Sequence, residues 1–458
     1  MSYSTWKRRP SRRAAQRRRV RLCLECLEGR AVPSALHAGP FAARPGGTTR
    51  TTVYTESNNP AAGQNAVLAF RQNAGGTLSE IGSFNTGGTG QNNFPTIVPG
   101  LPLGGLNLGA DDTSSEVVAT RDGRFLFAVN QGSNSVSSFR IKSNGGLILV
   151  GTFASRGVQP DSLAIAGNTL YVSNRGDTTT ASPAGTVVPN ITGFRISGYG
   201  ALRAIPGSTV TFPEGTSPSQ NLTTPNGKLL FSDVFGVPGS TAAGDNTLAP
   251  FQIEGNGALQ LAPGGNVGIP DGSNSLLLGA AFNPDLPIIY VGVAALNEVA
   301  VFTYTRSGQL TFVDAATTPL GGGATCWDST NGRYLYVTDT VTDSVSVFSL
   351  ANPLQPVQIQ QFALAGPQAP PGSPPGTIES NTYQVALSPD GNTLYVVDHD
   401  FGSPTLSFAD GNQLHVLSVA ANGTLSEPNA PVLLDTAGAV PGDALAQGIA
   451  VVVGRGRA

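Results

Sequence analysis

The sequence predicts an all-β protein: a seven-bladed β-propeller of four-stranded antiparallel blades, in which a C-terminal strand completes the first blade. Three observations support this prediction. A four-strand unit recurs along the chain, the second strand of each unit is apolar on both faces, and the first unit lacks a strand that the last residues can supply. We expect the propeller to span residues 46–458, after a basic N-terminal tail over residues 1–45 that lies outside the fold and is disordered.

The recurring unit is clearest in its second copy. Short apolar strands alternate there with turns that contain glycine, such as Asp122-Gly123 and Asn144-Gly145-Gly146. The expected strands of this copy are Glu116–Thr120, Phe125–Val129, Asn134–Ile141 and Leu147–Phe153.

A fixed spacing relates the copies to one another. In the third strand an aromatic residue or leucine follows Asn or Asp by five residues, and eight residues later a leucine opens the fourth strand. The pairs are Asn65/Phe70, Asn134/Phe139, Asn246/Phe251, Asn297/Phe302, Asp343/Phe348 and Asn412/Leu417, with Phe194 after Pro189 in the remaining copy. The leucines are Leu78, Leu147, Leu202, Leu259, Leu310 and Leu425, with Leu354 two residues early in the sixth copy. In six copies a glycine precedes the leucine by two residues, as a hairpin with positive φ requires.

The second strands, such as Phe125–Val129 and Leu394–Val397, are apolar throughout. An antiparallel strand with one solvated face would alternate between apolar and polar residues. These strands must therefore be covered on both sides, which a blade between two other blades provides.

The ends of the repeat indicate how the ring closes. The first copy has Thr52–Glu56, Asn65–Arg71 and Leu78–Phe84 as its second to fourth strands, but no first strand. After the complete last copy the chain continues into Gln447–Val453. We expect this segment to pair beside Thr52–Glu56, because that pairing removes two open sheet edges.

Charge and composition exclude several classes of partner. The net charge of −3 is uneven, because residues 1–30 hold ten basic and two acidic residues and leave a net charge of −11 on the remainder. Such an acidic body disfavours nucleic acid. No stretch approaches the roughly 18 apolar residues of a membrane-spanning helix. The three cysteines offer no disulfide framework, and Cys326 is expected to be a small buried side chain. We further expect a monomer without a cofactor.

The tail contains a specific segment. Residues 22–34 fit the pattern LxLExLExRxxPS at every fixed position, with Cys23 and Cys26 at variable positions. This segment resembles the N-terminal sequence of many large exported proteins of planctomycete bacteria. The resemblance implies export, to the cell surface or the extracellular space.

The long connections predict where a site lies. They fall between second and third strands or between blades, and these two types of connection emerge at the same end of the ring. The long connections are residues 85–115, 175–189, 236–245, 363–380 and 399–411. We therefore place any functional site at this long-loop end, at the mouth of the central channel.

The first strands line the channel, and aligning them gives two columns of mostly small polar residues near its mouth. The first column is Ser115, Asp161, Ser219, Ala324 and Tyr383, and the second is Glu116, Ser162, Gln220, Thr325 and Gln384. Hydrogen bonds to channel water and to neighbouring backbone explain most of them. Asp161 and Glu116 are the candidate catalytic carboxylates.

A second acidic group opens and closes the long loop of the seventh copy. Asp398, His399, Asp400 and Asp410 offer oxygen and nitrogen ligands for a divalent cation. Capping of strand ends explains them as well, and the matching positions Asn130, Asn174, Asp233 and Asp339 favour capping. We expect no metal site here. His415 should be exposed, because it lies on the strand face opposite Leu414 and Val416.

Two turn-and-strand segments, Arg121–Asn130 and Ser388–Val397, resemble the "SPDGRxLYVxN" units of the lactonase family. That family includes 6-phosphogluconolactonase-like and carboxymuconate-cyclase-like propellers. The resemblance spans about residues 50–453, and Tyr336–Asp339 is also similar to the "YVTN" units of surface-layer propellers.

The lactonase resemblance implies hydrolysis of a sugar or related lactone, with His and Arg where the inner strands of the middle blades reach the channel mouth. At those positions this sequence has Asp161 and Ser219-Gln220, and no arginine lies in the two columns. Lactone hydrolysis requires a general base and a group that stabilises the oxyanion. Asp161 can act as the base. A non-catalytic propeller that binds a glycan, peptide or protein partner therefore remains the alternative.

Overall fold

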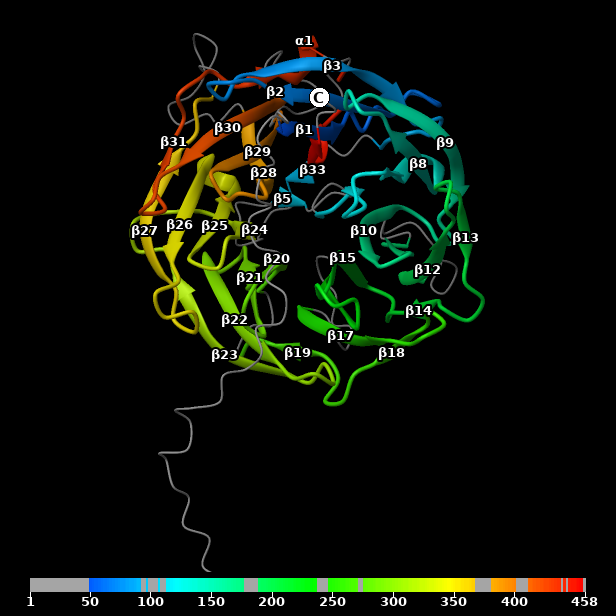
Figure 1. Ribbon diagram of the computed structural model, residues 1–458. Coiled ribbons are helices and arrows are strands. Elements are labelled where there is room, and N and C mark those ends of the chain that lie inside the picture. Colours follow the sequence, from blue (N-terminus) through cyan, green and yellow to red (C-terminus); the bar gives the residue numbers. More distant parts are fainter. Residues whose placement is uncertain are drawn as a thin grey trace, which may run out of the picture. The chain divides into compact units, whose positions relative to one another are not determined.

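The structure, a computed structural model, describes residues 49–91, 96–97, 106–107, 113–176, 188–236, 246–270, 275–366, 380–400, 411–437, 440–441 and 444–455. The tail, with its segment at residues 22–34, lies outside the described residues. The described residues form seven antiparallel sheets of four or five strands and one separate hairpin of two strands. Figure 1 shows the seven sheets side by side around a central axis, and the all-β seven-bladed propeller is confirmed.

The strands of the first four blades follow in chain order. The first blade contains β1 (Thr49–Glu56), β2 (Ala66–Gln72), β3 (Leu78–Asn85) and the C-terminal β33 (Gln447–Arg455), and the hairpin β4 (Thr96–Ile97) and β5 (Leu106–Asn107) follows β3 in the chain. The second contains β6 (Val117–Ala119), β7 (Phe125–Asn130), β8 (Ser135–Ile141) and β9 (Leu147–Ala154). The third contains β10 (Pro160–Ala166), β11 (Thr169–Asn174), β12 (Asn190–Ile196), β13 (Leu202–Ala204) and β14 (Val210–Thr211). The fourth contains β15 (Thr216–Thr223), β16 (Leu229–Gly236), β17 (Thr247–Ile253), β18 (Leu259–Leu261) and β19 (Val267–Gly268).

Three further blades complete the ring. The fifth contains β20 (Leu277–Phe282), β21 (Ile288–Val293), β22 (Glu298–Tyr304) and β23 (Leu310–Thr317). The sixth contains β24 (Thr325–Thr330), β25 (Tyr334–Asp339), β26 (Ser344–Ser349) and β27 (Val357–Ala363). The seventh contains β28 (Ser380–Leu387), β29 (Thr393–Asp400), β30 (Gln413–Val419), β31 (Leu425–Ser426) and β32 (Val432–Leu433). Two single-turn 3₁₀ helices, η2 (Gln131–Ser133) and η3 (Thr340–Thr342), and the short α1 (Leu434–Ala437) join strands, and no described helix has the length and apolar character needed to cross a membrane.

The inner strands contact one another around the ring, in the order β33, β6, β10, β15, β20, β24, β28 and back to β33. The closing pairing is the expected one: Thr51, Thr52 and Val53 of β1 lie opposite Val453, Val452 and Val451 of β33. The C-terminal segment is thus the inner strand of the first blade, as we predicted because the first copy of the repeat lacks a first strand.

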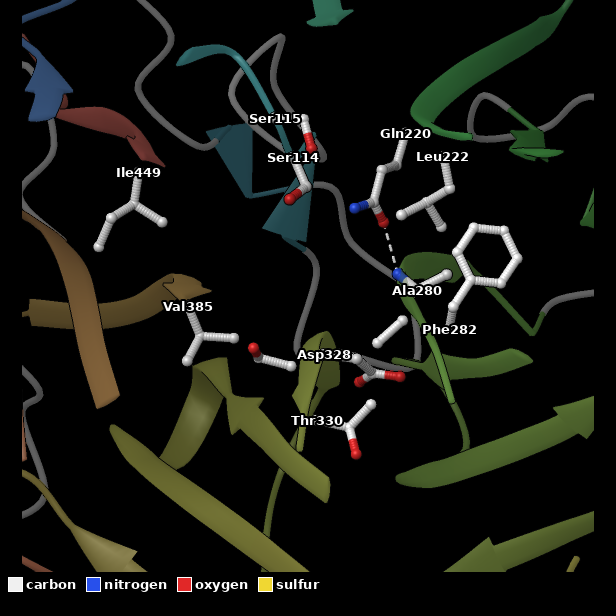
Figure 2. A pocket seen from close by; sticks show the side chains of 12 residues that line it. Ser114, Ser115, Gln220, Leu222, Ala280, Phe282, Asp328, Thr330, Val385 and Ile449 are labelled. Carbon is white, nitrogen blue, oxygen red and sulfur yellow. Dashed lines mark hydrogen bonds between the residues drawn. The ribbon is translucent and has the colours of Figure 1, made fainter. Parts of the chain in front are cut away.

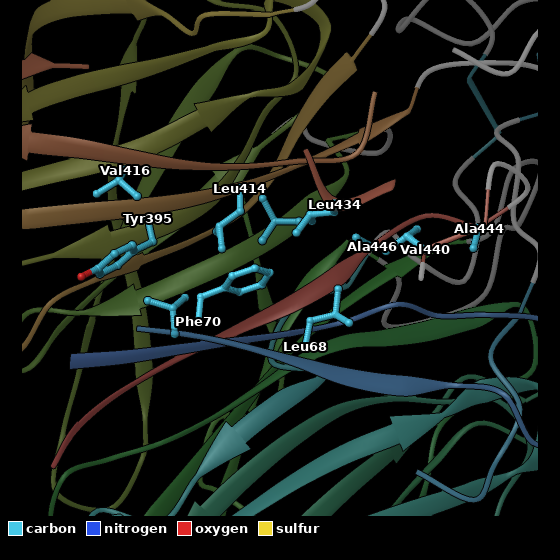
Figure 3. Packing of buried hydrophobic residues seen from close by; sticks show 11 residues of the cluster. Leu68, Phe70, Tyr395, Leu414, Val416, Leu434, Val440, Ala444 and Ala446 are labelled. Atoms are coloured by element: carbon cyan, nitrogen blue, oxygen red, sulfur yellow. The ribbon is translucent and has the colours of Figure 1, made fainter. Parts of the chain in front are cut away.

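Packing between neighbouring blades forms the core. Every residue of the second strands β7, β11 and β21 is buried, which confirms that both faces of these strands are covered. Figure 3 shows the cluster where the first and seventh blades meet, with Leu68 and Phe70 of β2 against Tyr395 of β29 and Leu414 of β30. Closure therefore buries apolar surface as well as pairing strands.

The repeated turn residues adopt left-handed conformations, which were predicted for the glycines but not for the Asn and Asp residues. Asn134, Asn246, Asn297 and Asp343 have φ between 46° and 55° before their third strands. The glycines of the hairpins before the fourth strands, Gly76, Gly145, Gly200, Gly257, Gly308 and Gly423, have φ between 84° and 90°. The sixth blade differs from the predicted spacing. Its fourth strand, β27, begins at Val357, whereas Leu354, which was matched to the leucines that open the other fourth strands, lies in the preceding turn.

Candidate functional site

An irregularity interrupts the inner strands at one level of the channel. The shifts fall between Pro160 and Ser162 in β10, Pro218 and Gln220 in β15, Leu277 and Ala280 in β20, Thr325 and Asp328 in β24, and Thr382 and Val385 in β28. Asp161 and Ser219 are the extra residues of the first two. Bulges re-aim side chains and are frequent beside active sites. Because these two bulges occur at the same position in their strands, Asp161 and Ser219 fall in the same column when the first strands are aligned.

Asp161 is a buried carboxyl at the bulge of β10. Its side chain is fully buried, and neither carboxyl oxygen has a hydrogen-bond partner within the described residues. Burial raises the pKa of Asp161 well above its usual range; the Arg175 guanidinium opposes this rise, whereas the Glu116 and Asp233 carboxylates add to it. A carboxylate with a raised pKa is a stronger base than an exposed one, as general-base catalysis requires.

Arg175 supplies the cationic group that the inner-strand columns lack. It follows the last residue of β11, and its backbone N–H donates to Gln159 O at 3.0 Å, directly across from the Asp161 bulge. Its side chain is buried, and its guanidinium carbon lies 5.6 Å from the centroid of the Phe235 ring. The two predicted columns contain only residues of first strands, so they do not include an arginine that follows the end of a second strand.

Glu116 is fixed by hydrogen bonds from two directions. Thr113 Oγ1 lies 2.6 Å from Glu116 Oε1, and Gln384 Nε2 of the seventh blade donates to the same oxygen at 3.0 Å. Gln384 is oriented in turn by the backbone N–H of Gly448, which donates to Gln384 Oε1 at 3.3 Å. Glu116 therefore acts on Asp161 through its charge, while its own position is set by blades one and seven.

The three residues that lead into β6, Thr113–Ser115, extend between blades that are not neighbours. The Ser114 N–H donates to Ser219 O of the fourth blade at 3.3 Å, and Gln384 Nε2 of the seventh blade donates to Thr113 O at 2.8 Å. From the third blade, Ser162 Oγ donates to Ser114 O at 2.6 Å. We call Thr113–Ser115 the crossing segment, because it ties opposite sides of the channel together.

A cavity of about 260 Å³ lies between the crossing segment and the opposite end of the ring. Figure 2 shows its lining, to which Ser114 and Ser115 contribute from the crossing segment. The remaining lining residues come from the middle and the ends of first strands: Gln220, Leu222, Ala280, Ala281, Phe282, Asp328, Ser329, Thr330, Val385 and Ile449. Of the expected channel residues, Ser115 and Gln220 thus lie on this cavity.

The other expected channel residues make contacts within and between blades. Ser162 Oγ accepts from the Asn221 N–H at 3.0 Å as well as donating to Ser114, and Ser219 Oγ donates to Asp233 O at 3.4 Å. Thr325 is buried. The Tyr383 ring stacks on His399, with ring centroids 3.7 Å apart, and lies tilted against Trp327, with ring centroids 4.7 Å apart. Tyr383 belongs to a buried apolar cluster.

The acidic group of the seventh blade contains an ion pair, and His415 is not exposed as expected. His415 is fully buried, with Nε2 2.9 Å from Asp398 Oδ2 and Nδ1 2.7 Å from Glu427 Oε1. The expectation was wrong because the face opposite Leu414 and Val416 is also covered. Asp410 and the side chain of Asp400 lie outside the described residues. Among described side chains, no three His, Cys, Asp or Glu come together as a metal site requires.

Comparison with known proteins agrees with this architecture. A family model described as "Lactonase, 7-bladed beta-propeller" matches residues 62–184, within the first three blades. The comparison with curated proteins gives no match. Several solved structures share the fold across most of the chain.

Three of those structures illustrate the likeness. The periplasmic gluconolactonase of Pseudomonas aeruginosa is 14% identical with a TM-score of 0.62, covering 88% of this chain and 99% of its own. A protein of Bacteroides fragilis, provisionally named a 6-phosphogluconolactonase, is 18% identical with a TM-score of 0.61, covering 88% and 98%. A protein of Lactobacillus plantarum is 13% identical with a TM-score of 0.60, covering 88% and 100%. At these identities the likeness establishes the fold.

Proposed function

We propose that the protein is an exported lactonase that hydrolyses a sugar lactone or a related lactone at the long-loop end of its channel. One observation carries the proposal: the buried carboxyl of Asp161, whose oxygens have no hydrogen-bond partner among the described residues, lies in the field of the buried Arg175 guanidinium. The family match over residues 62–184 supports lactone chemistry. Among solved structures of the same fold, one is named a gluconolactonase.

Asp161 and Arg175 supply the two groups that lactone hydrolysis requires. Asp161 takes a proton from water, the hydroxide oxygen attacks the lactone carbonyl carbon, and Arg175 stabilises the negative oxygen that develops there. As the carbonyl re-forms, the ring C–O bond breaks, and the proton held by Asp161 passes to the leaving alkoxide. One lactone and one water become one hydroxy acid.

The acidic surroundings of Asp161 serve this reaction in two ways. Burial and the Glu116 and Asp233 carboxylates make Asp161 a stronger base than an exposed aspartate. The product is a carboxylate, so the same acidic residues disfavour its retention.

The test is an assay of the full-length protein on glucono-δ-lactone, 6-phosphoglucono-δ-lactone and an aliphatic γ-lactone, with acid release followed by a pH indicator. Asp161→Asn is expected to lower kcat by about 10²- to 10⁴-fold, the usual contribution of a general base. Asp122→Asn, an exposed turn residue, is the matched control. Unchanged turnover in Asp161→Asn would remove this residue from the mechanism.

Arg175→Gln tests the second group. We expect kcat to fall by about 10²- to 10³-fold with little change in KM, because an oxyanion donor acts mainly in the transition state. A rise in KM alone would mean that Arg175 only binds the substrate. If the unaltered protein turns over none of the lactones, the alternative of a non-catalytic propeller that binds a glycan, peptide or protein partner takes precedence.

Export is the remaining part of the proposal, and residues 22–34 support it through their fit to the sorting pattern. Deleting these residues is expected to leave the protein inside a planctomycete host, while the full chain reaches the cell surface or the medium. Fractionation with an antibody against the propeller measures the difference. Equal distribution of the two forms would contradict a sorting role.

A further inference from the structure

The cavity beyond the crossing segment is distinct from the Asp161 site. Ser114 and Ser115 form the wall that faces the long-loop end, and hydrogen bonds to Ser219 and Ser162 fix this wall. At the other end the lining residues Leu222, Phe282 and Thr330 are only half-buried, so solvent reaches the cavity from the side of the short turns. Its volume of about 260 Å³ lies just below the usual range for small-molecule sites, roughly 300–1,000 Å³.

Asp328 gives this cavity a buried carboxyl acceptor. The side chain is 9% exposed and lines the cavity, and neither of its carboxyl oxygens has a hydrogen-bond partner within the described residues. Two further carboxyls, Asp233 and Asp339, lie close enough to act on it: burial first, and then these two groups, raise the pKa of Asp328 well above its usual range. A buried acceptor in such a field favours a cationic ligand and disfavours an anion.

Gln220 gives the cavity a donor of fixed direction. Its Oε1 accepts a hydrogen bond from the Ala280 backbone N–H, which settles the orientation of the amide. The amide nitrogen therefore points the other way, and Figure 2 shows it on the side of Ser114. The donor and the Asp328 acceptor thus belong to different blades that line one cavity, the fourth and the sixth.

The rest of the lining narrows the class of ligand. Leu222, Phe282, Val385 and Ile449 present apolar surface, which suits the C–H faces of an organic molecule. Within the described residues no group of three metal-ligating side chains is present, so Asp328 lacks the carboxylate partners that a dehydrated divalent ion prefers.

We propose that this cavity binds a small primary amine that also carries hydroxyl groups, of the size of a hexosamine. The Asp328 carboxylate accepts from the ammonium group, the Gln220 amide donates to a hydroxyl oxygen, and the apolar residues contact the carbon skeleton. The site is independent of lactone hydrolysis, because neither Asp161 nor Arg175 is among the residues that line the cavity.

Calorimetric titration of the full-length protein tests the proposal with three sugars that differ at one substituent. Glucosamine should bind, whereas glucose and N-acetylglucosamine, which lack the ammonium group, should bind at least about tenfold more weakly. Asp328→Asn should weaken glucosamine binding by at least about tenfold.

Controls separate binding from folding and from catalysis. Asp328→Asn removes a buried acid that faces two other carboxyls, so its melting temperature should equal or exceed that of the unaltered protein. Turnover of any lactone substrate should be unchanged in this variant. Absence of glucosamine binding, equal binding of glucose, or unchanged glucosamine binding in Asp328→Asn would each overturn the proposal. Binding of calcium chloride that depends on Asp328, without glucosamine binding, would replace it with an inorganic cation site.

Discussion

A buried histidine of the seventh blade, His415, contacts a carboxylate with each of its ring nitrogens. His415 of β30 lies between Asp398 of β29 and Glu427, which follows β31. Burial alone would lower the pKa of His415, but the two carboxylates outweigh it and raise the pKa to about 10. Both ring nitrogens therefore carry protons at neutral pH and donate charge-assisted hydrogen bonds.

Replacing His415 by Ala should lower the free energy of unfolding by about 3–5 kcal/mol, because two carboxylates would stay buried without their cation. Urea denaturation followed by circular dichroism measures the change. Asp122→Asn is the control, since the contact of Asp122 with Arg124 is exposed and 3.9 Å long. A loss no larger than that of the control would mean that water compensates the two carboxylates.

The repeated pattern could have predicted the buried ion pair of His415, but not the position of Arg175. In the second and sixth blades a serine two residues into the third strand lies by the second-strand residue that pairs with the start of the third strand: Ser137 by Asn130, at 2.8 Å, and Ser346 by Asp339, at 2.6 Å. His415 and Asp398 occupy the same two positions, so aligning third strands would have predicted the ion pair. Arg175 lies beyond the aligned strands. In the fourth blade, Asp233 lies one residue before the position that matches Asn130 and Asp339. Its carboxylate accepts a hydrogen bond from the Gly279 N–H at 2.9 Å.

At the level of elements, the closing strand β33 depends on one glycine. Gly448 has φ +70°, and a Cβ there would lie 2.9 Å from the Val117 backbone nitrogen and 3.1 Å from Glu116 Cβ. Its own N–H donates to Gln384 Oε1. This glycine lets β33 approach β6 closely, at the junction that also positions Glu116.

Gly448→Ala should lower the melting temperature by several degrees, because a side chain here meets both an unfavourable φ and a backbone atom, at a cost of about 1–3 kcal/mol. Gly255→Ala is the matched control, since no atom lies within 4 Å of its added Cβ and its φ is not positive. Differential scanning calorimetry of both variants gives the comparison. Equal melting temperatures would mean that β33 shifts without cost.

Apart from the hairpin β4–β5, the strands that the sequence did not predict are the short ones at the outer edge. In the third, fourth and seventh blades a second outer strand, β14, β19 or β32, pairs with the third strand beside a short fourth strand. Each of these extra strands has only two residues, too few for any alternation to be visible. Longer strands and the closing segment were predictable because burial on both faces leaves a continuous apolar run.

For the whole molecule, buried acids dominate the response to pH. Burial is the main cause that raises the pKa of Asp233 and Asp339 to about 7 and that of Asp343 to about 8. A carboxyl with a raised pKa binds its proton more tightly in the folded protein, so folding loses stability as pH rises through these values. His415 acts in the same direction: its contribution is complete below its unfolded pKa of 6.5 and is lost as pH rises through about 10.

The melting temperature should therefore fall steadily from pH 5 to pH 9. Thermal unfolding at constant ionic strength measures this, and Asp343→Asn should flatten the part of the curve between pH 5 and pH 8, where the folded protein keeps a proton on Asp343 that the unfolded chain has lost. A melting temperature that rises over this interval would show that the buried acids are ionised in pairs with cations.

Joining the first and the last strands of the ring in one sheet also sets an order of assembly. Glu56 and its partner Gln447 are 391 residues apart in the chain. At the usual rate of translation, about 5–20 residues per second, roughly 20–80 s separate their synthesis. For that interval the nascent chain carries β1 with one side unpaired, a template for pairing with other chains, until the final strand emerges from the ribosome and occupies it.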